Sequence, residues 1–443
     1  MESTLHTYPH PDGEIQRVQR ILLDDWQSLQ FLQPQPSPEA LPRIAALFRE
    51  FFVKQYPYLY GRLFFFRIPE GLPVPMVQEE HFGEIEDPLT RANVLFRKYI
   101  RRRGKELSFL RGDVRELYEK LKAGGDLLEA EGKLPRLTFL PLGERFGFLS
   151  ETEREAALKV NANFFVMDQW DCASVYDRLG TPVGLCLKDD RILNPPSFER
   201  EVLTVSREGK VRVSHLPLSE VSISVGEKTY RDKVNARFYT RLQGRRTPAG
   251  GTDLILCGER LIAVKKGGKS DIPSGGMVIR TEEELPTGRE VSYHGGEELR
   301  FALQTGSSAV IDGVPVTSFR SPFYRFWRFW EASYPPAMYP LNYRKDRAPR
   351  IILGADKEER PLLLWFEGAA KIGHQAGTDS CGATLLEAAE IAAQLGVHNG
   401  IQLDGGGSAE ILLHDERKLL LSDRDPVTLQ ERERPIPLGL FVR

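Results

Sequence analysis

The sequence of 443 residues is poor in cysteine, in net charge and in long apolar runs. Its four cysteines are far apart and form no Cys-x-x-Cys pair, which argues against a disulfide framework or a structural zinc site. No stretch approaches the ~18 consecutive apolar residues that a membrane helix needs. The formal net charge of −2 gives no general reason to expect a nucleic-acid or membrane partner. We therefore expect free cysteines, no membrane span and no nucleic acid.

The first residues also lack the pattern of a signal peptide, because no basic segment precedes an apolar run. This absence predicts a cytoplasmic protein. The hydrophobic fraction of 41% and the charged fraction of 28% are ordinary for a soluble globular chain. The length exceeds what one hydrophobic core usually organises, so two domains are expected.

Residues 1–135 are predicted to form a mainly helical N-terminal domain of unknown role. Apolar side chains between Ile15 and Leu32 recur near the helical period. Further helical patterns follow at 41–52, 91–103 and 113–121. The segment carries no motif with chemical meaning. Its basic cluster, Arg97–Lys105, is interpreted as a solvated helix end rather than a ligand patch, because acidic residues follow closely.

Residues 145–443 have a different sequence pattern, in which glycine and proline turns separate short β-rich runs. The predicted strands are Pro182–Leu187, Glu201–Val205, Val211–His215, Val221–Ser224, Asp253–Cys257, Leu261–Lys265, Met277–Arg280, Leu299–Leu303 and Ala309–Ile311. One late helix should begin at Thr384, where Thr384 and Glu387 have capping-box spacing, and end at Gly396. The overall expectation is an α+β fold, with a helical N-terminal segment followed by a mixed, largely antiparallel β domain.

The sharpest local signal is the segment Leu403–Ser408, which reads Leu-Asp-Gly-Gly-Gly-Ser between two strand-like runs. Consecutive glycines lose much backbone entropy on folding, so a plain turn rarely uses three. Glycines also let backbone amides approach and bind an anion. Taken alone, the segment is compatible with a glycine-rich hairpin and with a ligand-binding loop.

The surroundings of this segment resemble the phosphodiester glycosidase family. The helix start Cys381–Ala389 and the segment Arg350–Asp356 are similar to the family's G-x-T/S-x-x-E-x-A and R-x-x-x-G-x-D patterns. Five more segments follow the family's order. They are Val160–Phe165, Thr181–Gly184, Asn235–Thr240, Gly306 with Asp312-Gly313, and Glu433–Pro435. Two positions depart from the pattern, because Glu367 and Ala369 stand where the family usually has the aspartate and arginine of Asp-Gly-Arg.

The resemblance implies a hydrolase that cleaves the glycosidic bond of a sugar-1-phosphodiester, with a sugar phosphate or a glycan as substrate. Such chemistry needs carboxylates that activate water or stabilise positive charge at the anomeric carbon. Asp404 is the first candidate and Glu367 its partner. No cofactor and no metal are predicted.

The substrate would be held by a second set of residues. Arg350 and Arg434 are candidates for the phosphate, because an arginine can donate two parallel hydrogen bonds to an anion. The remaining predicted substrate-binding residues are Gly405, Gly406, Gly407, Ser408, Asn161 and Asp356. Asn161 either contacts substrate or fixes a loop, and the sequence leaves both roles open.

Two other features are compatible with function and with a structural role. His374 lies in a glycine-containing loop, where an acid–base role competes with that of a solvated loop residue. The aromatic run Phe323–Trp330 could stack on a sugar, although such runs more often belong to a core or an interface.

One alternative function is a catalytically weak or inactive module that binds a phosphosugar or polysaccharide, which the departures at Glu367 and Ala369 motivate. A nucleotide-binding enzyme is not supported. Lys266–Ser270 resembles part of a P-loop, but Ala263 occupies the position of the required first glycine.

Overall fold

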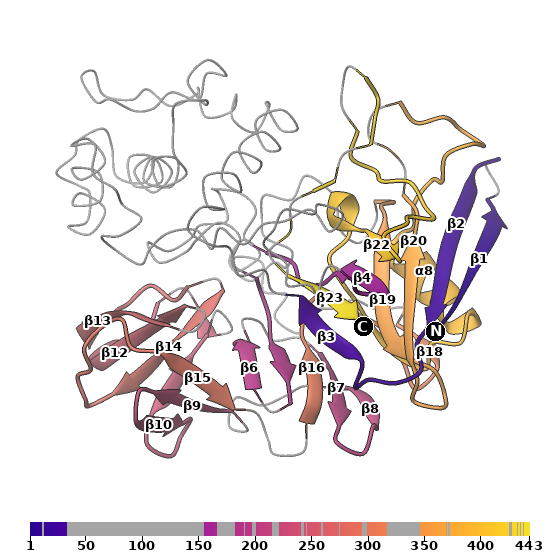
Figure 1. The fold of residues 1–443 in the computed structure, drawn as a ribbon. Helices are drawn as coiled ribbons and strands as arrows, with labels where there is room; N and C mark the ends of the chain where they lie inside the picture. The colour runs from indigo at the N-terminus through magenta and orange to yellow at the C-terminus, as the bar shows by residue number, and fades with distance from the viewer. Residues whose placement is uncertain are drawn as a thin grey trace, which may run out of the picture.

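The computed structural model describes residues 1–10, 13–32, 155–165, 182–189, 191–196, 201–214, 221–240, 243–244, 246–257, 260–273, 275–294, 299–316, 346–368, 370, 373–424, 428–431, 433–434, 436 and 438–443. The strands among them form four sheets (Figure 1). Within the described residues, α8 (Leu385–Gln394) is the only α-helix.

The first sheet has seven strands in the order β1-β2-β20-β19-β21-β17-β18. Its strands are β1 (Glu2–Pro9), β2 (Ile15–Leu22), β17 (Ser308–Ile311), β18 (Val314–Pro315), β19 (Arg350–Ala355), β20 (Pro361–Phe366) and β21 (Asn399–Gln402). Neighbouring strands are antiparallel. Both faces of β19 and β20 are covered, one by a cluster that includes α8 and the other by the main core. Their sequences are therefore nearly continuous apolar runs.

A second, four-stranded sheet has the order β22-β4-β23-β3. Its strands are β3 (Leu29–Leu32), β4 (Leu158–Asn161), β22 (Ile411–Leu413) and β23 (Gly439–Val442). β22 is the next strand after β21, so the Leu403–Glu410 segment crosses from the first sheet to this one. The predicted loop is thus fixed at both ends by strands of different sheets.

The other two sheets lie on the far side of the second sheet from α8 in Figure 1. An eight-stranded sheet contains β5 (Cys186–Lys188), β6 (Arg191–Asn194), β7 (Val202–Ser206), β8 (Val211–Ser214), β9 (Ser222–Val225), β10 (Lys228–Arg231), β15 (Val291–His294) and β16 (Leu299–Leu303). A four-stranded sheet contains β11 (Arg237–Tyr239), β12 (Ala249–Cys257), β13 (Arg260–Gly268) and β14 (Gly276–Thr281). Every pairing in both sheets is antiparallel.

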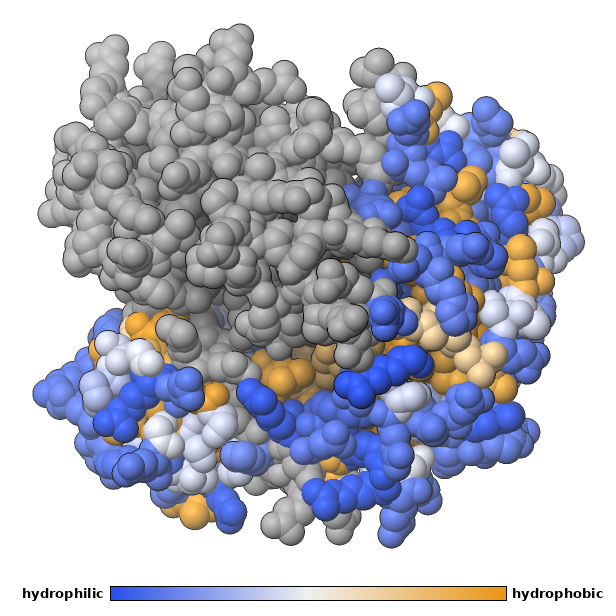
Figure 2. Space-filling view, viewed as in Figure 1, coloured by the Kyte–Doolittle hydropathy of each residue, from blue (hydrophilic) through white to orange (hydrophobic). Residues whose placement is uncertain are grey.

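One apolar core joins the first, second and eight-stranded sheets. It contains Ile351 from β19, Val160 from β4 and Phe301 from β16. A separate cluster joins the outer part of the eight-stranded sheet to the four-stranded sheet. In Figure 2, hydrophilic side chains predominate among the coloured residues on the face in view, as expected when the strands direct their apolar side chains inward.

The predicted α+β class with a helical N-terminal segment is wrong, because the described chain is β-rich and Ile15–Leu22 forms strand β2. β2 pairs with β1 on one side and β20 on the other. Ile21 faces the main core while Val18 packs on the cluster that includes α8. A strand covered on both faces has no simple alternation, so its apolar spacing imitated a helix.

Two of the three N-terminal strands pair with strands from the last hundred or so residues of the chain. β2 lies beside β20 and β3 lies beside β23, which Figure 1 shows as indigo strands next to orange and yellow ones. The predicted domain boundary between 135 and 145 lies outside the described residues and stays a prediction. The other predicted helices, 41–52, 91–103 and 113–121, and the basic cluster Arg97–Lys105 also lie outside them.

The late helix is confirmed. Thr384 is the N-cap of α8, and the reciprocal contacts of a capping box with Glu387 are present. Gly396, at φ +96°, follows the C-cap Leu395. Each strand predicted between Glu201 and Ile311 overlaps an observed strand.

Candidate functional site

The backbone around Asp404 is held by two sheets. Asp404 lies two residues beyond β21, and its amide donates to the carbonyl of Ala162, just after β4, at 2.8 Å. Its side chain is buried, with 3% of the residue exposed. The β21–β22 crossing therefore places a carboxylate in the interior, where an ionised group is costly unless it is compensated.

Asn161 at the end of β4 fixes this loop. Its Nδ2 donates to the carbonyl oxygen of Asp404 at 2.7 Å, and its Oδ1 accepts from the amide of Glu410 at 3.1 Å. Both ends of the side-chain amide thus bind backbone groups of one segment. Of the two roles left open for Asn161, these contacts favour the loop-fixing one.

The glycines have separate structural reasons. Gly406 has φ +60°, and its amide donates to the carbonyl of Pro349 at 3.0 Å, so this amide is not directed at a ligand. A Cβ on Gly407 would lie 1.9 Å from Oδ2 of Asp423. Only glycine therefore permits this carboxylate to approach the loop so closely.

Burial determines the ionisation of Asp404. It raises the pKa of this carboxyl from 3.8 to about 7, although hydrogen bonds from Ser408 and the Gly405 backbone and the charge of Arg434 oppose the rise. The nearby carboxylate of Asp423 adds to it. Among the described residues, the buried Oδ1 of Asp404 has no hydrogen-bond partner. The site thus contains a carboxyl that changes charge near neutral pH.

Asp423 and Arg434 form a buried ion pair beside this carboxyl. Arg434 donates from Nη2 and Nε to Oδ2 of Asp423 at 2.8 and 3.1 Å, and from Nη1 to Oγ of Ser408 at 3.3 Å. The structure therefore brings Asp404, Ser408 and Arg434 together, as the sequence predicted. Asp423 was missed, although a charged residue after the apolar run Leu419–Leu421 could have indicated it.

The backbone of Arg350 lies beside the Asp404 loop, because a Cβ on Gly405 would be 3.8 Å from the Arg350 Cα, whereas Asp356 is remote from it. The guanidinium of Arg350 donates to the carbonyls of Ala383 and Asp346 at 3.1 and 2.9 Å. Asp356 follows the opposite end of β19, roughly 20 Å along the strand. There it accepts from the amides of Glu358 and Arg360 in the β19–β20 turn. These contacts give Arg350 and Asp356 roles in the fold.

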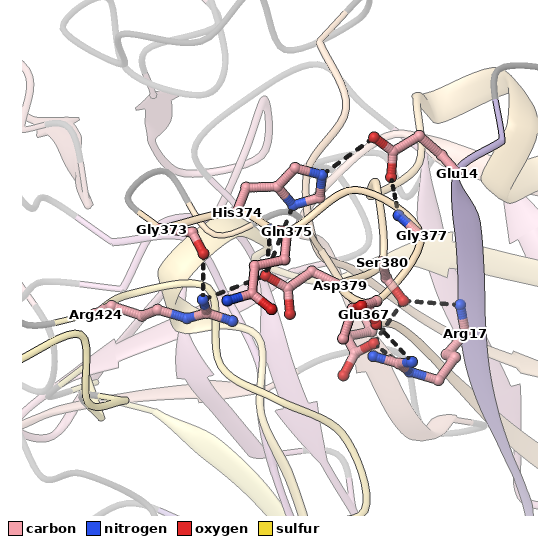
Figure 3. Close-up of polar contacts among 11 residues, drawn as sticks. Glu14, Arg17, Glu367, Gly373, His374, Gln375, Gly377, Asp379, Ser380 and Arg424 are labelled. Atoms are coloured by element: carbon pink, nitrogen blue, oxygen red, sulfur yellow. Dashed lines mark hydrogen bonds and ion pairs between the residues drawn. The ribbon is translucent and has the colours of Figure 1, made fainter.

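Glu367 occupies a closed network, which Figure 3 shows at the end of β20. Its Oε2 accepts from Nε of Arg17 at 2.6 Å and from Oγ of Ser380 at 2.5 Å. Its Oε1 accepts from the amide of Leu420 at 2.7 Å. Since β19 separates β20 from β21, the Glu367 and Asp404 backbones are roughly 10 Å apart. Sequence inspection missed Arg17 because its segment was interpreted as a helix.

His374 lies between two carboxylates, as Figure 3 shows. Its Nε2 is 3.3 Å from Oε1 of Glu14, and its Nδ1 is 3.9 Å from Oδ2 of Asp379. Burial acts to raise the pKa of Asp379, but the amide of Gln375, the guanidinium of Arg424 and His374 outweigh it and leave this pKa lowered. Glu14 therefore ties the loop to the β1–β2 turn through His374 and the amide of Gly377, while Asp379 ties it to Arg424.

The described residues contain no group of three or more His, Cys, Asp or Glu side chains arranged to hold a metal ion. In the same part of the chain, no helix is long and apolar enough to cross a membrane. Cys186 and Cys381 are free and buried. Ala369 and the aromatic run Phe323–Trp330 lie outside the described residues.

Comparison with known proteins gives one sequence match and several weak structural ones. The profile of the phosphodiester glycosidase family matches residues 233–443. No curated protein matches the chain significantly. A hypothetical protein from Synechocystis aligns over 100% of this chain and 62% of its own, with 16% identity and a TM-score of 0.42. The chain thus spans about three fifths of the length of that protein.

Two further solved structures are similar at the same low level. A putative exported protein from Burkholderia pseudomallei aligns over 66% of both chains, with 16% identity and a TM-score of 0.36. The zebrafish N-acetylglucosamine-1-phosphodiester α-N-acetylglucosaminidase catalytic domain, auto-inhibited by its pro-peptide, covers 100% of this chain and 82% of its own, with 10% identity and a TM-score of 0.38. Similarities this weak do not establish an activity. The sequence match confirms the resemblance to the phosphodiester glycosidase family over residues 233–443, which include Asp404, Asp423 and Arg434.

Proposed function

We propose that this protein is a hydrolase that cleaves the glycosidic bond of a sugar-1-phosphodiester, with Asp404 as its catalytic carboxylate. The observation that carries the proposal is the state of Asp404 in the family's loop. Its carboxyl is buried, one of its oxygens has no partner among the described residues, and its pKa is raised to about 7. A general base is most effective when its pKa is near the working pH.

In this mechanism ionised Asp404 removes a proton from a water molecule. The water oxygen forms a bond to the anomeric carbon, and the bond from that carbon to the phosphate oxygen breaks. The electron pair leaves with the phosphate monoester, while Asp404 later returns its proton to solvent. A phosphate is a good leaving group, so a second carboxyl that donates a proton is not required. The contacts of Glu367 with Arg17, Ser380 and Leu420 support a structural role instead.

Arg434 reduces the repulsion between the carboxylates of this cluster and an anionic substrate. Arg434 lies within the loop cluster and reaches Ser408. Its pairing with Asp423 offsets one unit of charge, and its field lowers the cost of bringing a phosphodiester near Asp404. Arg350, which binds the carbonyls of Ala383 and Asp346, is better placed to hold the fold than to bind phosphate.

Hydrolysis of synthetic methyl α-glycosyl phosphates in ¹⁸O-labelled water tests the proposal. Cleavage between the anomeric carbon and oxygen places ¹⁸O in the free sugar, whereas attack on phosphorus places it in the phosphate. We expect the label in the sugar and loss of turnover in Asp404→Asn. Label in the phosphate would overturn the glycosidase assignment.

A second candidate is a module that binds a phosphosugar without cleaving it. The closed contacts of Glu367, the expected partner of Asp404, favour this alternative. Saturable binding of a sugar phosphonate, without turnover of any glycosyl phosphate in a panel of common hexoses, would support it over the hydrolase.

A further inference from the structure

Two buried carboxylate oxygens in the Asp404 cluster have no hydrogen-bond partner among the described residues. They are Oδ1 of Asp404 and Oδ1 of Asp423, and these residues are 3% and 1% exposed. Leaving a buried polar group without a hydrogen bond lowers the stability of the fold. Both carboxyls belong to one loop cluster, because Oδ2 of Asp423 lies against Gly407 and Arg434 donates to both Asp423 and Ser408. Two unsatisfied carboxylate oxygens in one cluster indicate a binding site for a ligand that donates hydrogen bonds.

Another aspartate–arginine pair in the same chain provides the contrast. Asp253, on β12, is completely buried and accepts from Nε of Arg280 through Oδ1 at 2.8 Å. Its Oδ2 accepts from Nη2 of Arg280 at 3.1 Å and from Oγ1 of Thr247 at 2.5 Å. Both oxygens of Asp253 are therefore used inside the fold. At Asp423, by contrast, Arg434 occupies only Oδ2 and leaves Oδ1 without a partner.

The ligand of Asp423 Oδ1 must be a hydrogen-bond donor. A carboxylate oxygen accepts hydrogen bonds, whereas a phosphodiester has only acceptor oxygens and a negative charge. A sugar hydroxyl supplies a donor without charge. Because Arg434 balances the charge of Asp423, this group can lie near a phosphodiester without strong net repulsion.

We propose that Asp423, which lies against Gly407 and is held by Arg434, binds a hydroxyl of the substrate's sugar ring and thereby sets the sugar specificity of the site. This inference rests on the proposed function for its substrate class. A site built to bond a hydroxyl discriminates strongly against an analogue that lacks it, because its own polar group is then left buried and unpaired. Asp423 is thus a specificity residue, separate from the carboxylate that activates water.

The test compares methyl α-glycosyl phosphates with their 2-, 3-, 4- and 6-deoxy analogues. For the wild type we expect one deoxy analogue to lose roughly 10²-fold or more in kcat/KM. In Asp423→Asn this discrimination should fall below about tenfold, with the loss confined to that hydroxyl. Glu410→Gln is the matched control, because Glu410 is also a buried carboxyl of the same segment, on the other side of Asn161. It should leave the discrimination unchanged.

Unchanged discrimination in a folded Asp423→Asn variant, with turnover intact, overturns this inference and leaves the hydrolase assignment standing. If the wild type cleaves none of these compounds, the proposed function fails. Calorimetric binding of the corresponding glycosyl phosphonates then tests the hydroxyl contact by the same deoxy series. A crystal of the wild type with a phosphonate bound requires no variant. A sugar hydroxyl within about 3 Å of Asp423 Oδ1 is expected, and any other group there contradicts the inference.

Discussion

Asp404 and Glu367 are both buried carboxylates that follow strands of one sheet, β21 and β20, yet their surroundings differ. Glu367 has a partner at each oxygen, from Arg17, Ser380 and the amide of Leu420. Asp404 has one oxygen without a partner among the described residues and a pKa raised to about 7. A satisfied buried charge stabilises a unique arrangement, whereas an unsatisfied one costs stability and is available for a ligand. The comparison distinguishes a carboxylate whose two oxygens are both bonded within the fold from one that keeps an oxygen without a partner.

The largest effect should follow Asp404→Asn. Turnover of a sugar-1-phosphodiester should fall by roughly 10²-fold or more, because the variant cannot accept the proton of the attacking water. Binding of a glycosyl phosphonate should change little, since the lost interaction belongs to the transition state. Steady-state kinetics and calorimetry on one preparation measure both quantities. Near wild-type turnover in the folded variant would remove Asp404 from catalysis.

The same variant should be at least as stable as the wild type. Folded Asp404 keeps its proton up to about pH 7, whereas the unfolded chain releases it near 3.8. The wild type therefore loses stability as pH rises from about 4 to about 7, and an asparagine does not. Melting temperatures at pH 5 and pH 8 should show the larger gain at pH 8. A lower melting temperature at pH 8 would instead assign Asp404 to loop structure.

Glu367→Gln should lower stability and leave turnover nearly unchanged. Removing the charge leaves Arg17 with a weaker partner in a largely buried network, at a cost of about 3 kcal/mol. Turnover per folded molecule should remain close to that of the wild type, because both carboxylate oxygens of Glu367 are already bonded within the fold. Urea unfolding and kinetics measure the two effects. A stable Glu367→Gln variant with a hundredfold loss of turnover would restore Glu367 as a catalytic partner.

Replacing Glu410 should have a smaller effect, a change in stability that depends on pH. Burial, and then the charge of Glu433, raise its pKa to about 8 despite its contact with Arg417. The folded protein therefore holds a proton that the unfolded chain releases near 4.5, and stability falls as pH rises between these values. Glu410→Gln should raise the melting temperature by a few degrees at pH 8 and much less at pH 5. Equal shifts at both pH values would contradict this ionisation.

His374→Asn should have the smallest effect. The side chain is partly exposed, and its contacts to Glu14 and Asp379 are 3.3 and 3.9 Å long. Exposed or partly exposed ion pairs contribute up to about 1 kcal/mol. We therefore expect a slight loss of stability and turnover within about twofold of the wild type. A pH profile of kcat/KM that loses a limb in this variant would instead identify His374 as an acid–base group.

Parts of the site could be predicted from sequence because their signals are local. The capping box of Thr384 and Glu387 depends on spacing within one turn, and it is present in α8. The Leu-Asp-Gly-Gly-Gly-Ser segment stood out because three glycines are rarely used without a close approach or an unusual backbone angle. Gly406 has the unusual angle and Gly407 has the close approach.

Other parts depended on long-range contacts. Ile15–Leu22 imitated a helix because β1 and β20 pair with both of its edges and both of its faces are covered. Arg17 and Glu367 are 350 positions apart in the chain, so no local pattern could pair them. Asp423 was missed because its importance comes from Arg434 and Gly407, which reach it only through the fold.

The sequence by itself determined the family resemblance of residues 233–443, the helix at Thr384 and the loop that carries Asp404, because each rests on residues close together in the chain. The tertiary structure decided that the N-terminal strands belong to the sheets and that Glu367 is fully partnered. It also decided that Asp404 and Asp423 keep unpartnered oxygens. Burial and hydrogen-bond satisfaction are properties of the packed chain, so no single segment could have revealed which carboxylate keeps an oxygen without a partner.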